Sequence, residues 1–328
     1  MFGRCAEKVP DQTLLCPDSC TNMIKVRGIS ARLILCWALL LSSFATIAEG
    51  YLEQFSFRKE TKYFEFHFKR NPERIAAISR FADSFVTLLK RDFFKADFVY
   101  PIRVLVLEDR AAFQEFLRRE FRVNDPPNFG IYLSANKLFA TYEDSGLGTF
   151  THEILHPLVE QNLKDRPLWA MEGIPAFFEK FYGYWKDDGL VVHWGYQNPW
   201  RIEMLGTNLV QLDLRTLLAT KQPQGQFHES DLRMVSMFLW EQGKFQRFLQ
   251  LIQQQKKDGY ESYFEAALEM PIERIVPLWK RYLIKVAERR SEILRWPPSA
   301  ILADEPTFQN FIEFYGVPVD KMKTEQQR

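Results

Sequence analysis

The sequence predicts an α+β fold, with a small mixed sheet and its helices in the first half and an all-helical second half. Strand-like and helical segments alternate up to about residue 147, and helical spacing of apolar residues dominates after it. Of the 328 residues, 46% are hydrophobic and 15% are aromatic. A chain of this size and composition can bury a large core, in one domain or in two.

The charge balance excludes one class of partner. The chain has 43 Lys and Arg residues against 42 Asp and Glu residues, a formal net charge of +1. Its body contains no strongly basic block of the kind that binds a phosphate backbone. We therefore expect no nucleic acid partner.

Residues 1–22 are interpreted as an N-terminal extension outside the folded protein. Cys16 and Cys20 have a spacing that suits a metal, but no second pair follows, so a zinc ribbon is not expected. The chain has no cysteine after residue 36, so the mature protein is expected to have no disulfide. The four cysteines are Cys5, Cys16, Cys20 and Cys36.

Residues 23–48 have the three parts of a secretory signal. A basic segment precedes a short apolar run, and the small residues Ala45 and Ala48 follow it. We therefore expect translation to begin at Met23 and the mature protein to be exported, with a periplasmic or extracellular location. The apolar run is short for a membrane-spanning helix. The alternative is an uncleaved anchor at residues 33–48, which would be the protein's only contact with the membrane.

The first half begins with a strand and a helix. Residues 64–68 alternate between phenylalanines and polar side chains, as in a half-buried strand, and His67 falls on the polar, solvated face. Asn71 can cap the following helix, and Pro72 suits its first position. Apolar residues then recur at helical spacing: Ile75, Ile78, Phe81, Phe85 and Leu88.

A second strand, a second helix and a hairpin follow. Residues 102–109 form an apolar run typical of a buried strand. Residues 110–121 place three apolar side chains on one side of a helix. Residues 129–144 hold two strand-like segments that turn near Asn136.

Helices are expected from Leu147 onward. The first has an apolar side that includes Phe150, and the next, around residues 169–182, follows a break at residues 165–167. The segment 183–205 has too many Gly, Asp and Trp residues for one regular element. Further helical patterns span residues 230–243, 245–255, 260–270 and 271–290.

These patterns divide the mature chain into three parts. Residues 49–182 form the α/β half, residues 183–290 form the mostly helical half, and residues 291–328 form a tail with several prolines. We expect this tail to lie across the domain. No internal repeat or low-complexity segment is present.

One of these helices carries two of the chain's five histidines. His152 and His156 are four positions apart, and such residues are rotated by about 400° and lie roughly 6 Å apart along a helix. Both imidazoles can therefore face one point and bind one metal ion. Glu153 is rotated by about 100° from His152. Its carboxylate therefore stays free to accept a proton from a reacting water.

A zinc site of this kind needs a third protein ligand. Glu172 lies sixteen positions after His156, far enough for a turn and a return on the next helix. The alternative is a structural histidine pair. A His-Glu-x-x-His pattern arises by chance on the order of once in a hundred chains of this size. The Trp-x-x-Glu-Gly pattern at residues 169–173 makes coincidence rarer still.

The segments THEILHP and LWAMEGIPAFFE resemble the gluzincin metallopeptidases, in particular the bacterial peptidase-MA-like family. The signature of that family is His-Glu-x-x-His, then Trp-x-x-Glu-Gly and an aromatic-Glu ending. The resemblance implies a zincin-like metallopeptidase domain in which Glu153 is the general base. It implies a Zn²⁺ ion bound by His152, His156 and Glu172.

Two prolines depart from the family pattern. Pro157 cannot donate to the carbonyl of Glu153 and is expected to kink or loosen the helix, at about 3 kcal/mol in an unadapted helix. Pro175 is tolerable only if Glu172 lies near the start of its helix. The resemblance also implies that the strand at residues 137–142 can bind an extended substrate by edge pairing.

Peptide hydrolysis also needs a hydrogen-bond donor for the developing oxyanion. We favour His228 for this role, because it begins a later helix. Phe227-His228 stands where related sequences often carry a tyrosine, which is a further departure from the family pattern. The other candidates are Tyr182, Tyr184, His193 and Tyr196.

The sequence thus predicts an exported zinc-dependent peptidase that acts on peptide or protein substrates. The alternative is a catalytically weak relative that binds zinc or a protein partner, with the aromatic loop 194–200 as part of its interaction surface. Turnover with and without Glu153 separates the two, whereas metal content does not. The sequence predicts neither cleavage specificity nor oligomeric state.

Overall fold

The computed structural model describes residues 50–97, 101–187, 189–205, 209–220, 227–254, 259–296 and 300–304. The predicted extension and the predicted signal or anchor lie outside the described residues, as does the tail after Asp304. The chain divides into two units, residues 1–51 and residues 52–328. The account below concerns the unit that begins at Leu52. None of the helices in the described ranges is long and apolar enough to cross a membrane.

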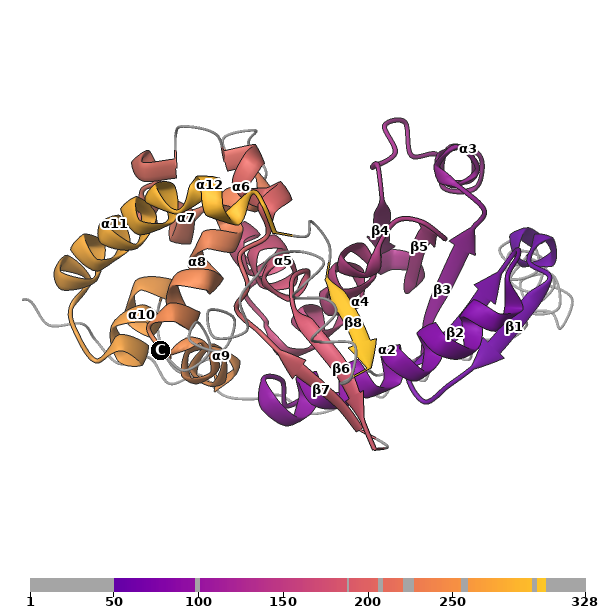
Figure 1. Cartoon of the computed structure of the whole chain (residues 1–328), viewed down its shortest axis with the longest axis horizontal. Helices are drawn as coiled ribbons and strands as arrows, with labels where there is room; N and C mark the ends of the chain where they lie inside the picture. The colour runs from indigo at the N-terminus through magenta and orange to yellow at the C-terminus, as the bar shows by residue number, and fades with distance from the viewer. Residues whose placement is uncertain are drawn as a thin grey trace, which may run out of the picture. The chain divides into compact units, whose positions relative to one another are not determined.

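A mixed five-stranded sheet organises the first half (Figure 1). Its strand order is β1-β2-β3-β5-β4, with β2, β3 and β5 parallel and the two outer strands antiparallel to their neighbours. The sheet confirms the predicted strands and hairpin and adds β1, which was not predicted. The strands are β1 Phe57–Glu60, β2 Phe64–Phe68, β3 Ile102–Leu107, β4 Gly130–Leu133 and β5 Leu138–Tyr142.

Helices cover both faces of this sheet. The helix α2 (Pro72–Asp92) packs with the phenylalanine face of β2, and Phe81 and Phe66 both contact Phe150. The helix α3 (Arg110–Phe121) covers the opposite face, where Phe116 contacts Phe55. Parallel strands are normally buried on both faces in this way. The predicted cap at Asn71 has no hydrogen bond to the helix; its amide donates to Glu143 instead.

The prediction of a solvated His67 is wrong. The side chain is buried, its ring packs on Phe55, and its Nε2 lies 2.8 Å from the carboxylate of Glu65. Burial lowers the pKa of His67, although the hydrogen bond that its ring donates to Glu65 opposes this shift. The alternation in β2 marked the polar face correctly, but Phe55 packs on His67 and on Phe116 of α3, so this histidine is covered rather than open to water.

The hairpin places β4, not β5, at the edge of the sheet. Residues 134–136 form a short 3-10 helix, η2, which confirms the predicted turn near Asn136. β5 pairs with β3 on one side and with β4 on the other. The strand at residues 137–142 therefore has no free edge for a substrate, and that part of the prediction is corrected.

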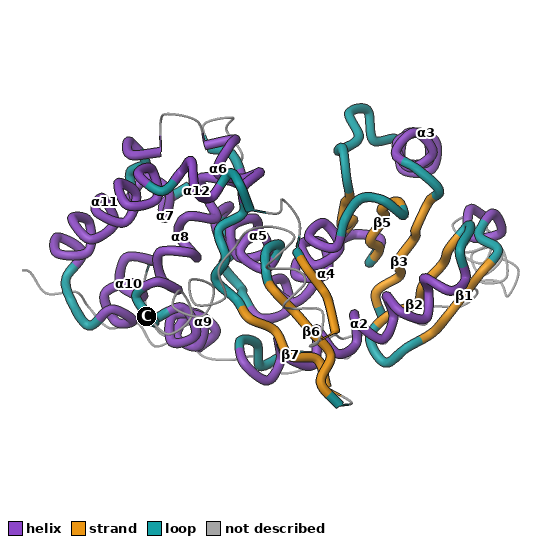
Figure 2. Tube along the Cα trace, in the orientation of Figure 1, coloured by secondary structure: helices purple, strands orange, loops and turns teal. Residues whose placement is uncertain are grey.

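The second half is mostly helical, as predicted, but it is not all helical (Figure 2). The segment expected to be irregular contains an antiparallel hairpin of β6 (Tyr182–Lys186) and β7 (Gly189–His193), and β8 (Ile301–Asp304) pairs with β6. The longer helices are α4 Leu147–Asn162, α8 Glu229–Glu241, α9 Phe245–Gln254, α10 Tyr260–Leu268 and α11 Ile272–Glu288. The short ones are α5 Ile174–Phe178, α6 Pro199–Leu205, α7 Leu214–Ala219, α12 Arg290–Ile293 and the 3-10 helix η4 Leu209–Gln211.

Aromatic packing holds the two halves together. Phe178 of α5 contacts Phe93, which follows α2, and also Phe245, the first residue of α9. The same apolar core includes Phe150 of α4. The helix with the two histidines is therefore fixed between the sheet and the helical half, which gives its side chains a rigid support.

Candidate metal centre

The helix α4 presents the two motif histidines on one side. His152 and His156 are buried, at 6% and 8% exposure, and their ring centroids are 4.9 Å apart. The helix continues through Pro157 to Asn162 without a break. The proline therefore does not interrupt the helix, and the one-turn spacing of the histidines is kept.

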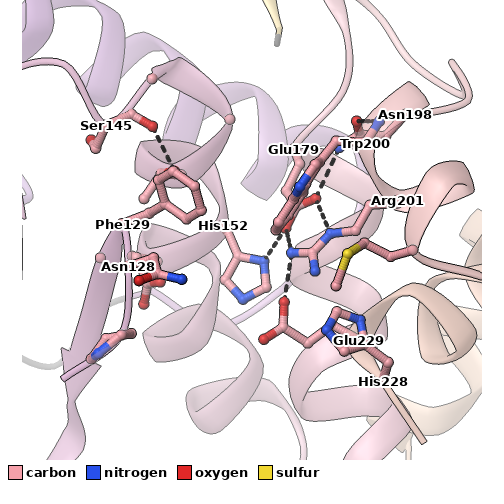
Figure 3. Close-up of a pocket in the computed structure, with 17 residues that line it drawn as sticks. Asn128, Phe129, Ser145, His152, Glu179, Asn198, Trp200, Arg201, His228 and Glu229 are labelled. Carbon is pink, nitrogen blue, oxygen red and sulfur yellow. Dashed lines mark hydrogen bonds and ion pairs between the residues drawn. The ribbon is translucent and has the colours of Figure 1, made fainter. Parts of the chain in front are cut away.

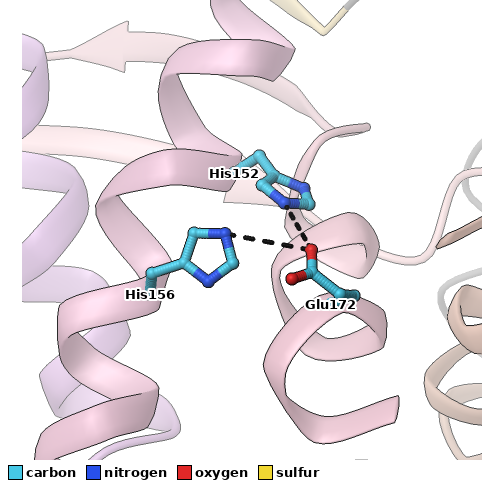
Figure 4. A group of neighbouring side chains, drawn as sticks. All are labelled: His152, His156 and Glu172. Atoms are coloured by element: carbon cyan, nitrogen blue, oxygen red, sulfur yellow. Dashed lines mark ion pairs between the residues drawn. The ribbon is translucent and has the colours of Figure 1, made fainter. Parts of the chain in front are cut away.

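Glu172 comes from the next helix and points at both histidines (Figure 4). Its Oε2 lies 3.3 Å from Nε2 of His152 and 4.0 Å from Nε2 of His156. Glu172 lies in a π-helical turn, η3 (Trp169–Gly173), that leads into α5. π-Turns are rare and occur often at functional sites. Pro175 sits at the start of α5, where its missing N–H costs little.

The packing of α8 explains why a glycine, Gly173, follows Glu172. A Cβ at this position would lie 2.4 Å from the carbonyl oxygen of Leu232, so α8 packs directly on the backbone of η3. The hydroxyl of Ser236 also donates to the carbonyl of Gly173 over 3.0 Å. This close packing fixes the turn that carries Glu172.

The three donors have the spacing of a metal site. One ligand atom from each of His152, His156 and Glu172 lies within 4.8 Å of the others. Two donors bound to one tetrahedral zinc at roughly 2.0–2.1 Å lie about 3.4 Å apart. The separations of 3.3 and 4.0 Å are close to that value. Two imidazoles and a carboxylate therefore suit a divalent cation such as zinc, and the predicted ligands are brought together.

The protonation of the two histidines differs in the metal-free protein. Burial lowers the pKa of His152, but hydrogen bonds to Glu172 and Glu179 outweigh it and leave this pKa well above its usual value. Burial, together with the charge on His152, lowers the pKa of His156 to about 4. Metal binding requires both rings to be neutral at the ligating nitrogen and therefore releases a proton from this pair.

Glu153 lies beside the metal ligands rather than among them. Its Oε2 is 3.8 Å from Nε2 of His156, and its side chain is buried. Burial raises the pKa of Glu153 to about 8, the charge of His152 lowers it, and the charge of Glu172 raises it further. The backbone of Tyr132 in β4 donates a hydrogen bond to this carboxylate.

Glu179 positions His152. The sequence alone did not assign a role to this buried glutamate. Nδ1 of His152 lies 2.7 Å from Oε1 of Glu179, and Arg201 of α6 donates to both oxygens of this carboxylate. Burial alone would raise the pKa of Glu179, but Arg201 holds it well below its usual range. Contact at Nδ1 leaves Nε2 of His152 free to face Glu172. The aromatic-Glu ending of the motif, Phe178-Glu179, was the available signal.

A second set of possible metal ligands lies around Arg201. His152, Glu179 and Glu229 bring ligand atoms within 4.8 Å of one another. The guanidinium of Arg201, however, bridges the two carboxylates and lies 2.5 Å from Oε2 of Glu229. The arrangement is that of an ion-pair network around a buried arginine.

A cavity of about 540 Å³ opens onto this centre (Figure 3). His152 and Glu153 lie on its wall, together with Glu179 and Arg201. The remaining walls come from the segment that leads into β4, the start of α4, the segment around α6 and the start of α8. Of the candidate centre, His152 and Glu153 therefore line this cavity, whereas His156 and Glu172 do not.

His228 lies on the wall of the same cavity, at the N-cap of α8. Its ring accepts a hydrogen bond from the backbone N–H of Ser230, and the carboxylate of Asp231 accepts one from its own N–H. The prediction that His228 begins this helix is confirmed. The other oxyanion candidates, Tyr182, Tyr184, His193 and Tyr196, do not line the cavity.

These four residues make packing and hydrogen-bond contacts within the fold instead. Tyr182, Tyr184 and His193 stack on one another across β6 and β7. The carbonyl of Tyr196 accepts a hydrogen bond from the fully buried Arg233. Of the residues considered for the oxyanion, the structure therefore brings His228 alone to the cavity.

Replacing Glu179 with Gln is expected to weaken metal binding about 10–100-fold, the usual effect of removing a partner that orients a ligand. The amide keeps the shape but removes the negative charge beside His152 and Arg201. Zinc affinity measured by competition with a chelating dye checks this result. Glu229→Gln is the matched control, because it also contacts Arg201 but makes no hydrogen bond to His152. Equal loss in both variants would contradict the assigned role of Glu179.

No known protein family and no curated protein matches this sequence. The resemblance to gluzincins therefore rests on the motif residues alone. What the structure adds is the convergence of His152, His156 and Glu172 into a group that can hold a metal ion.

Proposed function

We propose that this protein is a zinc-dependent peptidase of the gluzincin type. The observation that carries the proposal is the convergence of three side chains that can bind a metal, with a fourth side chain, the unligated carboxylate of Glu153, beside them on the wall of an open cavity. A purely structural histidine pair has no need of a cavity or of a second buried glutamate. The arrangement of Glu153 next to His152 is the one that metal-assisted hydrolysis uses.

Zinc is the proposed ion because of its ligands. Imidazole nitrogens and a carboxylate in a tetrahedral arrangement favour zinc over magnesium or calcium, which prefer oxygen ligands and higher coordination numbers. Three protein ligands leave one position for water, as in catalytic rather than structural zinc sites. Bound zinc supplies Lewis acidity, which lowers the pKa of a water ligand to about 7 and polarises a carbonyl.

Glu153 is proposed as the general base. Its carboxylate lies close to His156 and faces the cavity, so it can take the proton of the attacking water and pass it to the leaving amine. Glu179 and Arg201 hold His152 in place during these steps. His228 remains the proposed donor for the oxyanion, through the ring nitrogen that does not cap α8.

The edge of β4 that faces away from β5, which pairs with no other strand in the described residues, is the proposed binding place for the peptide backbone. Gly130 lies so close to α4 that a Cβ there would be 2.8 Å from Thr149 and 3.2 Å from Glu153. An extended peptide paired with this edge strand therefore passes beside the metal ligands. The backbone N–H of Tyr132 donates to Glu153, which supports a position of the proposed base beside this edge; that N–H is already used and does not pair with the peptide.

The alternative, a catalytically weak binding module, receives less support from the structure. Its proposed interaction loop, residues 194–200, is largely buried: Trp194 and Tyr196 belong to the interior, and Trp200 alone among the three aromatic residues is exposed. The buried part of this loop stabilises the fold instead of offering a surface.

The direct test is cleavage of a diverse peptide library by the zinc-loaded chain, read by mass spectrometry. We expect cleavage that stops when a chelator removes the metal and returns when zinc is added. Magnesium should not restore it. A protein that binds one zinc and cleaves no peptide in the library would support the binding module. Export remains a prediction, and N-terminal sequencing of the secreted protein checks it.

A further inference from the structure

Exposed apolar side chains gather at the mouth of the metal cavity. Six large hydrophobic residues are exposed in the part of the chain that the structure describes, and three of them line this one cavity. They are Phe129, Trp200 and Met204, with exposures of 40%, 36% and 49%. Apolar surface at a cavity mouth is typical of a ligand-binding site, whereas scattered single residues need no explanation.

Two of these residues contact each other at the cavity mouth. Phe129 precedes β4, Trp200 is the second residue of α6, and their ring centroids are 5.7 Å apart in an edge-to-face arrangement. Figure 3 shows both rings beside the group formed by His152 and Glu179. We call Phe129, Trp200 and Met204 the apolar rim.

The backbone beneath the rim is held in place. The carbonyl of Phe129 accepts a hydrogen bond from Thr141 of β5 over 2.9 Å. Asn198 links Trp200 to the metal centre: its Oδ1 accepts from the backbone N–H of Trp200, and its Nδ2 donates to Glu179. The apolar rim is thus preorganised relative to His152, which lowers the entropic cost of binding a ligand there.

The charges around the rim disfavour an acidic ligand. Glu229 and Glu179 share Arg201, so two carboxylates and one guanidinium lie together on this cavity wall. An acidic side chain placed here would lie near these carboxylates and would compete for a guanidinium that already bridges them. A large apolar side chain meets the exposed aromatic rings at no such cost.

We propose that the apolar rim binds one large apolar side chain, such as Phe, Leu or Met, of a peptide whose backbone lies along β4. The rim thereby selects peptides with such a residue close to the bond that is cut, and it rejects Asp and Glu at that position. This inference rests on the proposed peptidase function and names the substrate class for it.

The test uses two peptides that differ at one position, which is Phe in one and Glu in the other. Their common sequence is one that the library assay shows to be cleaved. If no peptide is cleaved, a library sequence that binds is used. Their binding to the zinc-loaded full chain with Glu153→Gln is measured by fluorescence anisotropy. We expect the Phe peptide to bind about 10–100-fold more tightly than the Glu peptide, the range for one apolar group in an apolar pocket. The Phe129→Ala/Trp200→Ala double variant should lose most of this difference.

Matched controls separate the rim from exposed apolar surface in general. Val210→Ala and Ile284→Ala remove exposed apolar side chains, 44% and 48% exposed, that do not line the cavity. Both should keep the full preference for the Phe peptide. Trp200→Phe, which retains an aromatic ring, should also keep most of it. Zinc content, measured in every variant, should stay at one ion per chain.

The outcomes distinguish this inference from the proposed function. Binding that favours Phe, without hydrolysis in the wild type, would support the rim and contradict the peptidase. Hydrolysis with equal binding of both peptides, or with a preference that survives the double variant, would overturn the rim and leave the peptidase intact. If no peptide binds at all, the rim inference is also wrong.

Discussion

Replacing His156 with Ala is expected to reduce zinc affinity by more than about 100-fold, because it removes a ligand itself and not merely a partner that orients one. His152→Ala and Glu172→Ala should have the same effect, since each supplies one of the three converging donors. Zinc per chain, measured by mass spectrometry after dialysis against a weak chelator, should fall from one ion to nearly none.

Thermal unfolding gives a second measurement of the same loss. A ligand present at a hundred times its dissociation constant stabilises the folded protein by about 2.7 kcal/mol. Zinc should therefore raise the unfolding temperature of the wild type but not that of His156→Ala. The result also tests for bound metal without relying on activity.

His67 and His193 provide the control. His67 is buried and paired with Glu65, so His67→Ala can lower stability, yet it lies in β2 and outside the group that can hold a metal. Both control variants should bind one zinc and keep the zinc-dependent rise in unfolding temperature. Loss of zinc from His67→Ala as complete as from His156→Ala would show that the ligand assignment is wrong.

The group that can hold a metal ion was predictable because it depends on local geometry. Residues four apart on a helix always lie on one side, so His152 and His156 needed nothing beyond a helix to converge. Glu172 followed from the length of chain needed to return on the next helix. The π-turn that carries it was not predictable, since it depends on how α8 packs against Gly173.

Features that depend on distant contacts were missed. The polar face of β2 was identified, but the burial of His67 depends on Phe55 and α3, which sequence alternation does not place. The hairpin was found, yet the strand order that puts β4 at the edge is a property of the sheet as a whole. Glu179 and Arg201 lie 22 positions apart, and no local pattern joins them.

The hairpin of β6 and β7 was missed for a different reason. Its Gly, Asp and Trp content indicated an irregular segment, and Asp187 at its turn has a positive φ of 51° that the sequence pattern alone does not reveal. Pairing with β8, more than a hundred residues later, helps to hold the strand β6. Strand propensity depends strongly on such neighbours.

The replacement of Glu153 by Gln should abolish most peptide hydrolysis while leaving the metal site intact. Glutamine keeps the size and hydrogen-bonding capacity of glutamate but cannot accept a proton. A general base typically contributes a factor of about 10²–10⁴ in rate. We therefore expect kcat to fall by at least about 100-fold, measured on the best substrate from the library, with zinc stoichiometry unchanged.

The same substitution should reduce the loss of folding stability that the metal-free protein shows as the pH rises toward neutral. Burial raises the pKa of Glu153 to about 8 in the metal-free protein, from the usual 4.5 of a glutamate. A carboxyl with a raised folded-state pKa is protonated more readily in the folded than in the unfolded chain, so its contribution falls as the pH rises from about 4.5 to 8. Glu153→Gln removes this titration, and its metal-free stability should decline less over that range than that of the wild type.

Two results would separate the role of Glu153 from a structural one. If Glu153→Gln cleaves peptides as fast as the wild type while both hold one zinc, the proposed mechanism is refuted. If its activity falls only because its zinc is lost, Glu153 supports the site rather than acts as its base. Pro157 makes this second outcome worth testing, because the carbonyl of Glu153 lacks the helical N–H partner that another residue at position 157 would supply. Zinc content and hydrolysis must therefore be measured on the same sample, and a loss of rate at full zinc occupancy identifies Glu153 as the proton acceptor.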